Sequence, residues 1–141
     1  MSITSDLLGG LAADLNAQGL ATYTGGAGGN VFFKALPASP DRAVALTAYA
    51  SQDDATQNLS TIRVQFYFRG SRDNVTDVDD LADSVFLWLQ GMQHKNYGVV
   101  HVAHALRLSA IQLGSDDSKR SERSDNYAFT CNLPSTSGRP E

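Results

Sequence analysis

Histidines, clustered carboxylates and a single cysteine are the residues of this sequence whose types could support chemistry. His101 and His104 lie three positions apart in a strand-like stretch. An odd separation along a strand places two side chains on opposite faces, so we expect these imidazoles not to share a metal ion. Four aspartates cluster where a helix is predicted to begin, without the spacing of an EF-hand. These aspartates are Asp77, Asp79, Asp80 and Asp83. A simpler role for them is to stabilise the positive N-terminal end of that helix.

No combination of a nucleophile, a base and an orienting acid is recognisable. Cys131 has no local signature of a catalytic thiol, and no serine lies in the pattern G-x-S-x-G. The glycine-rich segment GGAGGN lacks the Lys-Ser/Thr ending of a phosphate-binding loop and the spacing of a dinucleotide fingerprint. We therefore predict no enzyme activity, no cofactor and no metal site, and the role of loop 25–29 stays open.

Composition restricts the class of protein. The chain has 141 residues, enough for one domain, and no apolar run approaches the length of a membrane helix. Its formal net charge of -4 argues against a dedicated nucleic-acid binder. A single cysteine excludes an internal disulfide framework, and the N-terminal segment MSITSDLLGG has no leader pattern, so we expect the protein to be made in the cytosol. Thirteen of the fifteen acidic residues are Asp, which favours turns and caps over helix interiors.

Two helices are predicted from apolar residues at helical spacing. The first covers residues 4–18, with Ser2 or Thr4 as its cap and Gly19 as its stop, although Gly9 and Gly10 weaken it. The second covers residues 76–90, with Thr76 beginning a capping-box-like start and Gly91 ending it.

The rest of the chain is predicted to form strands. The expected strands are 31–36, 43–50 and 60–70, followed by two long arms at 98–113 and 119–133. Each arm could extend to about 50 Å, longer than the body of so small a domain, so we expect part of the hairpin to project. Alternation slips near Ser109, which predicts a bulge. The predicted fold is an α+β domain: a mixed, mainly antiparallel sheet with two main helices packed on it and a long projecting C-terminal β-hairpin.

Charged residues of both signs lie at the end of the third strand and at the tip of the hairpin. They form either a solvated turn or a contact between subunits, since mixed charges orient partners. The candidate subunit or partner interface consists of Arg69, Arg72, Asp73, Ser115, Asp116, Asp117, Lys119, Arg120 and Arg123.

Three segments together resemble a known family. They are LPASPDRAVALTAY (36–49), VQFYFRGSRDNVTDVDDLADSVFLWLQG (64–91) and SAIQLGSDDSKRSERSDNYAFTCNL (109–133). Their Pro-Asp-Arg turn, Arg-Gly and Arg-Asp pairs, Val-Asp-Asp-Leu-Ala-Asp helix start and Leu-Gly-x-Asp turn are similar to the minor capsid or tail terminator proteins of long-tailed bacteriophages, especially phages of actinobacteria. The order and spacing of these motifs, more than any one of them, carry the resemblance.

This resemblance implies a structural virion protein. It would form a homohexameric ring on the tail tube, stop tube polymerisation and join the tube to a head-closure or neck protein, while DNA passes through without specific binding. The expected location is the virion tail and neck, after assembly in the host cytoplasm. Residues 1–133 would form the terminator-like domain, and 134–141 a flexible tail. The alternatives are a head-completion protein, a tube subunit or, from a different class, a small-ligand-binding α+β domain.

Overall fold

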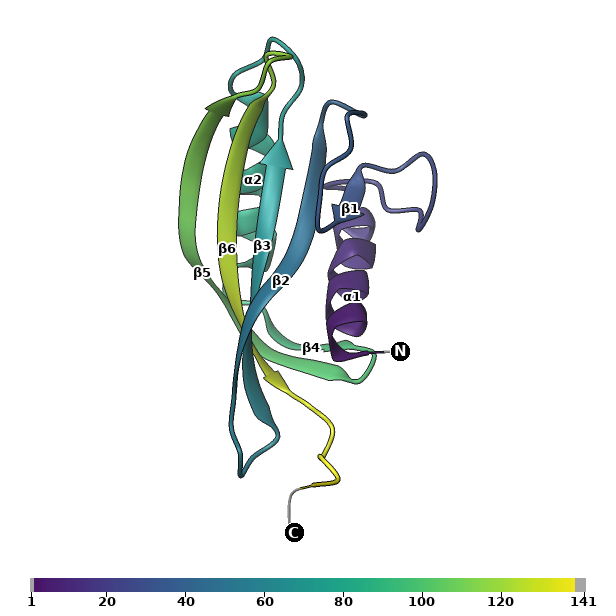
Figure 1. Cartoon of the computed structure of the whole chain (residues 1–141), viewed down its shortest axis with the longest axis vertical. Helices are drawn as coiled ribbons and strands as arrows, with labels where there is room; N and C mark the ends of the chain where they lie inside the picture. Colours follow the sequence, from purple (N-terminus) through teal and green to yellow (C-terminus); the bar gives the residue numbers. More distant parts are fainter. Residues whose placement is uncertain (1, 139–141) are drawn as a thin grey trace.

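The computed structural model describes residues 2–138, in which a curled six-stranded sheet packs two helices against one face (Figure 1). In chain order the elements are α1 (Ile3–Ala17), β1 (Val31–Phe33), β2 (Ala43–Asp53), β3 (Leu59–Arg69), α2 (Asp77–Leu89), β4 (Gln93–Tyr97), β5 (Val100–Ser115) and β6 (Ser121–Asn132). The strand order is β1-β2-β3-β6-β5-β4, and only the β1–β2 pair is parallel. The predicted α+β class with a mixed, mainly antiparallel sheet is confirmed.

The core lies between the helices and the inner face of the sheet. On β3, Ile62, Val64, Phe66 and Phe68 are buried, as the alternation of the sequence predicts. The facing residues of β6 are Tyr127, Phe129 and Cys131, all of them fully buried. One apolar cluster therefore joins both helices to the sheet.

The ends of the helices show which local signals work. Ser2 caps α1 by accepting a hydrogen bond from the backbone N–H of Ser5 at 2.9 Å. Gly19 and Gly91 follow the two helices with positive φ, as expected of stop residues. The predicted capping box of α2 is wrong, because Thr76 has helical backbone angles and its hydroxyl makes no capping bond.

Gly10 has a packing role in α1. A Cβ at this position would collide with the ring of Tyr97, whereas the space beside Gly9 is open. The hydroxyl of Tyr97 then reaches Asp14 of the same helix at 2.6 Å. Gly10 therefore lets the end of β4 pack directly on α1.

The predicted projection of the C-terminal hairpin is wrong. Strand β6 pairs with β3 from Glu122 to Asn132, which is nearly its whole length. It is therefore an interior strand. Near the bottom of Figure 1, the turn end of the β2–β3 hairpin instead extends below the two helices. Length alone misled the prediction, because it ignored the partner strand on the far side of β6.

Two further strands differ from the prediction. Strand β1 stops at Phe33, before the predicted 36, because Lys34 has a positive φ of 72° and the chain turns away. Strand β4 was not predicted, since its residues QHKNY are polar and mostly exposed. The predicted tail 134–141 lies partly outside the described residues.

Strand β5 contains three bulges. Its register with β6 shifts between Val102 and His104, between Arg107 and Ser109, and between Gln112 and Gly114. The second shift confirms the bulge expected near Ser109. Strand β5 pairs with β6 from His101 to Ser115, and its first part, up to His104, also pairs with β4 (Figure 1).

Candidate functional site

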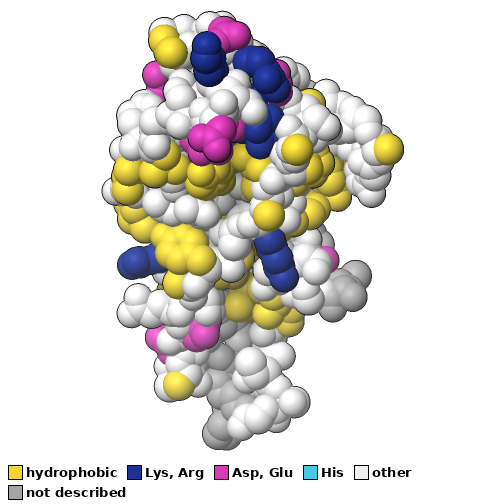
Figure 2. Space-filling view, turned by 45° about the horizontal axis from the view of Figure 1, so that its top comes forward, with side chains coloured by type: hydrophobic (Ala, Val, Ile, Leu, Met, Phe, Trp, Pro, Cys, Tyr) yellow, Lys and Arg dark blue, Asp and Glu magenta, His cyan; other side chains and the backbone are white. Residues whose placement is uncertain are grey.

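The end of the sheet at the top of Figure 1 carries most of the predicted interface residues. The end of β3, the β3–α2 loop, the β5–β6 turn and the segment 37–41 meet there, and we call this region the charged end. Figure 2 shows Lys, Arg, Asp and Glu side chains gathered at this end, above a band of hydrophobic side chains.

Arg69 fastens the segment 37–41 to the sheet. Its guanidinium donates to the backbone carbonyls of Asp41 at 2.8 Å, Pro37 at 2.8 Å and Pro40 at 2.6 Å. The residue is only 4% exposed. A buried charged group must satisfy its hydrogen-bonding capacity, and Arg69 does so within its own chain.

Arg120 and Arg72 converge on Asp41. Arg120 lies 3.2 Å from the Asp41 carboxylate and also donates to the carbonyl of Ala38. Arg72 approaches the same carboxylate at 3.4 Å, and its hydrogen bond lowers the pKa of Asp41. Arg120 is buried, whereas the side chain of Arg72 is half exposed.

The β5–β6 turn is organised by Asp116. Its carboxylate accepts from the backbone N–H groups of Ser118 and Arg120, and these bonds lower its pKa together with the Arg120 side chain. Backbone bonds then attach the turn to the β3–α2 loop, from Asp73 to Lys119 at 3.0 Å and from Gly70 to Ser121 at 2.9 Å. The hairpin tip is therefore tied down on its neighbours.

Arg123 joins α2 to the sheet. It forms a paired contact with Asp125 at 2.8 and 3.1 Å, and also reaches Asp79 at 3.0 Å and Asp83 at 2.9 Å on α2. Asp125 is fully buried and Arg123 is 6% exposed. The aspartates at the start of α2 thus have a specific partner, beyond their interaction with the helix end.

The predicted interface residues separate into two groups. Arg69, Arg120 and Arg123 are buried and paired within the chain. The residues with exposed side chains at the charged end are Arg72, Asp73, Ser115, Asp117 and Lys119, and Asp116 is partly exposed. An interface role stays a prediction for this set, and the buried arginines act by holding the loops that present it.

A second surface lies along β5 and was not predicted. Leu106, Leu108, Ile111 and Leu113 are each between 44% and 51% exposed. Strand β4 pairs with β5 no further than His104, so within residues 2–138 no strand covers this side of residues 106–115. The apolar residues and one bulge, near Ser109, were predicted from the sequence, but the bulges after Val102 and Gln112 were not.

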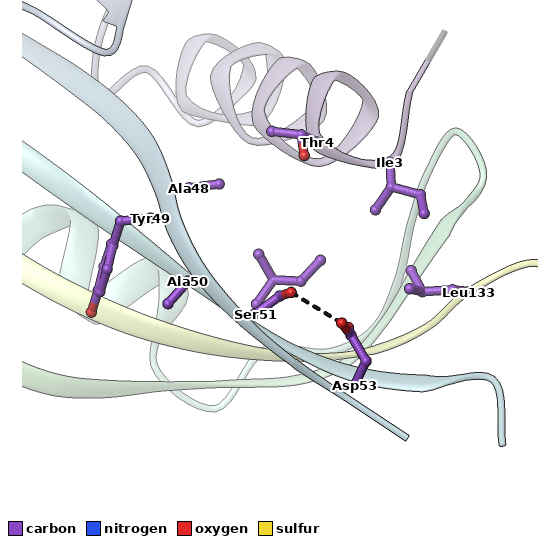
Figure 3. Close-up of a pocket in the computed structure, with 9 residues that line it drawn as sticks. Ile3, Thr4, Ala48, Tyr49, Ala50, Ser51, Asp53 and Leu133 are labelled. Carbon is purple, nitrogen blue, oxygen red and sulfur yellow. Dashed lines mark hydrogen bonds between the residues drawn. The ribbon is translucent and has the colours of Figure 1, made fainter. Parts of the chain in front are cut away.

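A cleft of about 410 Å³ lies between the start of α1 and the β2–β3 hairpin (Figure 3). Ile3, Ala48, Ile62 and Leu133 give it an apolar lining, and Ser51 and Asp53 supply its polar side. Tyr49 points away from the helix and is 49% exposed. The polar groups here bond to one another, as Ser51 does to Asp53 at 3.3 Å, and they do not converge as a catalytic set would.

The prediction that His101 and His104 lie on opposite faces of their strand is wrong. The bulge at residue 103 cancels the odd spacing, so His101 and His104 pair with Asn132 and Thr130 and lie on the same, outer face of the sheet. His101 contacts His94 at 3.5 Å between ring nitrogens. Within residues 2–138, no group of three or more His, Cys, Asp or Glu side chains is placed to hold a metal ion.

Cys131 is a buried core residue. It is fully inaccessible, and burial raises the pKa of its thiol to about 12. Such a thiol stays protonated at neutral pH, which does not suit a nucleophile. In the same described part of the chain, no helix has the length and apolar character to cross a bilayer.

Comparison with known protein families gives a match over most of the chain. The family model described as "Bacteriophage tail terminator protein" matches residues 14–133, from the second half of α1 to the residue after β6. No curated protein sequence matches the chain significantly.

Proposed function

The chain belongs to the bacteriophage tail terminator family, and from that premise we propose that its copies close into a homohexameric ring at the end of the tail tube. As a tail terminator it is a structural, non-enzymatic protein of the virion tail that caps the tube and joins it to the head. The match over residues 14–133 carries this conclusion, because it spans every strand of the sheet and all of α2.

A ring is the assembly that best fits this task. Contacts between two different surfaces of a subunit produce a ring when the rotation closes, and a filament when it does not. A closed ring has no free subunit surface around its circumference, so it can end a tube without adding lateral copies. Within residues 2–138 no further strand pairs with the outer edge of β5 over residues 106–115, and such an edge favours association with other copies.

The charged end is the proposed contact with an axial partner, either the tube protein or the neck protein. Its exposed residues carry both signs of charge, which orients a partner more than it adds affinity. They are Arg72, Asp73, Ser115, Asp117 and Lys119, with Asp116 at their edge. The buried Arg69 and Arg120 keep this surface rigid, which lowers the entropy lost on binding.

The phage type, the place in the virion and the compartment of assembly are inferred from the resemblance of the three sequence segments. We infer a long-tailed phage of actinobacteria as the source, a place in the neck of the virion, and assembly in the host cytoplasm. The formal net charge of -4 is compatible with a lumen that lets DNA pass without holding it.

The test uses the purified protein with the tail tube protein encoded beside it. Added at the start of tube polymerisation, the terminator should shorten the tubes seen by negative-stain microscopy, and native mass spectrometry should show a hexamer. Unchanged tube lengths would refute the capping role. Long tubes formed by the protein alone would identify it instead as a tube subunit.

A further inference from the structure

Two histidines meet across the β4–β5 hairpin, which lies below the start of α1 in Figure 1. His94 lies on β4 and His101 on β5, directly opposite Asn96. Because side chains alternate along a strand, His94 and Asn96 share a face of the hairpin with His101. The two imidazole rings are nearly parallel, with an interplanar angle of 29° and centroids 5.7 Å apart. His94 is exposed and His101 is half-buried, so an ion from solution can reach both rings.

The separation of the two rings suits a shared metal ion better than a hydrogen bond. Nδ1 of His94 lies 3.5 Å from Nε2 of His101. A hydrogen bond between a ring N–H and its acceptor is normally about 3 Å long. Two imidazole nitrogens that each bind a zinc ion at about 2.1 Å, at the tetrahedral angle, lie about 3.4 Å apart. The observed spacing therefore matches that of two ligands on one tetrahedral ion.

Asn96 determines which nitrogen of His101 is free to bind. Its side-chain oxygen lies 2.6 Å from Nδ1 of His101, and an amide oxygen only accepts, so Nδ1–H donates this hydrogen bond. The second nitrogen, Nε2, then presents its lone pair toward His94. Metal-binding histidines commonly donate their other N–H to such an oxygen, which orients the ring and increases its basicity. Asn96 is therefore a positioning residue for this pair.

The charges and the backbone around the pair are also compatible with a bound cation. Lys95 lies between His94 and Asn96 in the sequence, but it points to the opposite face of β4, where its Nζ lies 3.4 Å from Asp14 of α1. Its positive charge is therefore directed away from the imidazoles. His94 has a left-handed backbone, with a φ of 54°, which is uncommon for a residue other than glycine and recurs at functional sites.

We propose that His94 and His101 bind one divalent transition-metal ion of the kind that imidazole prefers, such as Zn²⁺ or Cu²⁺. Nδ1 of His94 and Nε2 of His101 are the two protein ligands, and water molecules complete the coordination. The ion links β4 to β5 through their side chains, in addition to the backbone pairing. The sequence predicted no metal site, because β4 was not predicted and His94 was not expected beside His101. The site does not depend on the proposed ring, so failure of tube capping leaves it unaffected.

Isothermal titration calorimetry of the full chain, without an added histidine tag, tests the site with zinc chloride and copper(II) chloride. We expect one ion per chain, with Cu²⁺ bound more tightly than Zn²⁺, which is the general order for nitrogen ligands. His94→Ala and His101→Ala should each weaken binding at least about tenfold, because the ion then has one protein ligand instead of two. No saturable binding to the unaltered protein, or unchanged affinity in either variant, would overturn the proposal.

His104→Ala is the matched control. His104 lies on the same outer face as His101, but its Nε2 contacts the hydroxyl of Thr130 at 3.3 Å. Its removal should leave the affinity for both ions unchanged. If His104→Ala weakens binding as much as His101→Ala does, the ion is not held by the pair of His94 and His101, and the proposal is wrong.

Variants of Asn96 test the positioning role. Asn96→Ala should weaken Zn²⁺ binding about tenfold or more, whereas Asn96→Asp keeps an oxygen that accepts from Nδ1–H and should restore it. Equal weakening by the two variants would refute the role of Asn96.

Thermal melting with and without Zn²⁺ gives a second measurement of the site. A ligand that binds only the folded state raises the melting temperature. Zn²⁺ should therefore raise it for the unaltered protein and for His104→Ala, but not for His101→Ala. Equal shifts in all three proteins would overturn the assignment of the site to this pair.

Discussion

Replacing Arg123 with alanine is the sharpest test of how the sheet holds α2. The guanidinium binds the fully buried Asp125 through two hydrogen bonds and also reaches Asp79 and Asp83 on the helix. The Arg123→Ala variant removes all three contacts at once. It leaves the Asp125 carboxylate in the core, with only Arg107 nearby at 3.5 Å.

The expected loss is about 3–5 kcal/mol in the free energy of unfolding at pH 7. This is the usual cost of removing one partner from a buried ion pair, because the other charge remains without compensation. The contacts to Asp79 and Asp83 add little, since these side chains are 38% and 62% exposed and solvent screens them. A domain of this size has a total stability of about 5–15 kcal/mol, so the variant should be close to unfolding.

The loss should depend on pH in a defined direction. Burial raises the pKa of Asp125, while hydrogen bonds and charge from Arg123 oppose that rise. Without Arg123 the folded-state pKa of Asp125 rises further above its unfolded value. The folded variant then holds this proton more strongly than the unfolded chain, so its stability falls as pH rises through that window. The cost of the substitution is therefore larger at pH 8 than at pH 5.

Urea denaturation at pH 5 and pH 8 measures both effects. Pairing Arg123→Met with Asp125→Leu should recover much of the loss, because no buried charge remains. Arg72→Ala is the control, since it removes a solvent-exposed partner of Asp41 and should cost far less. A cost of Arg123→Ala below about 1 kcal/mol and equal at both pH values would refute the assignment of a buried, ionised Asp125.

Three other outcomes follow from the structure, each measured by denaturation. Gly10→Ala should cost about 1–3 kcal/mol of stability, because the added methyl group meets the Tyr97 ring. Gly9→Ala is the control and should stabilise α1 by about 0.5–1 kcal/mol, because the space beside Gly9 is open. Equal effects of the two substitutions would contradict the packing of Tyr97 on Gly10. Tyr97→Phe should cost about 1–2 kcal/mol through its lost bond to Asp14, and no loss would argue against that bond. Stability should fall as pH drops below about 4, since hydrogen bonds lower four carboxyl pKa values in the folded state and protonation breaks them; a flat profile between pH 5 and pH 2 would contradict this. The groups are Asp41, Asp77, Asp79 and Asp116.

The sequence predicted helices and strands well where their position depends only on residues within the same segment. The spacing of apolar residues located α1 and α2 to within a residue of their ends. Alternation identified the buried face of β3, and glycines marked both helix stops. These features depend on residues close in sequence, so no knowledge of the partner segments was needed.

Features that depend on distant partners were missed or misassigned. The length of the C-terminal hairpin suggested projection, but the other side of β6 is occupied by β3, which lies about sixty residues earlier. The charged tip was recognised, yet the inward direction of Arg123 was not. One signal was available, because Arg123 and Asp125 share the parity of Tyr127 and Phe129 on β6, and that parity faces the core.

The bulges of β5 decide which of its residues share the outer face of the sheet, and the break in alternation near Ser109 indicated only one of the three. Each bulge adds one residue and therefore reverses which parity faces outward. His101 and His104, three residues apart, consequently share the outer face, and so do Leu106 and Ile111, five residues apart. A regular strand would have turned one member of each pair toward the core. The same three insertions that bend β5 around the helices thus gather aliphatic side chains on an open edge, where this single chain has nothing to cover them within its described residues.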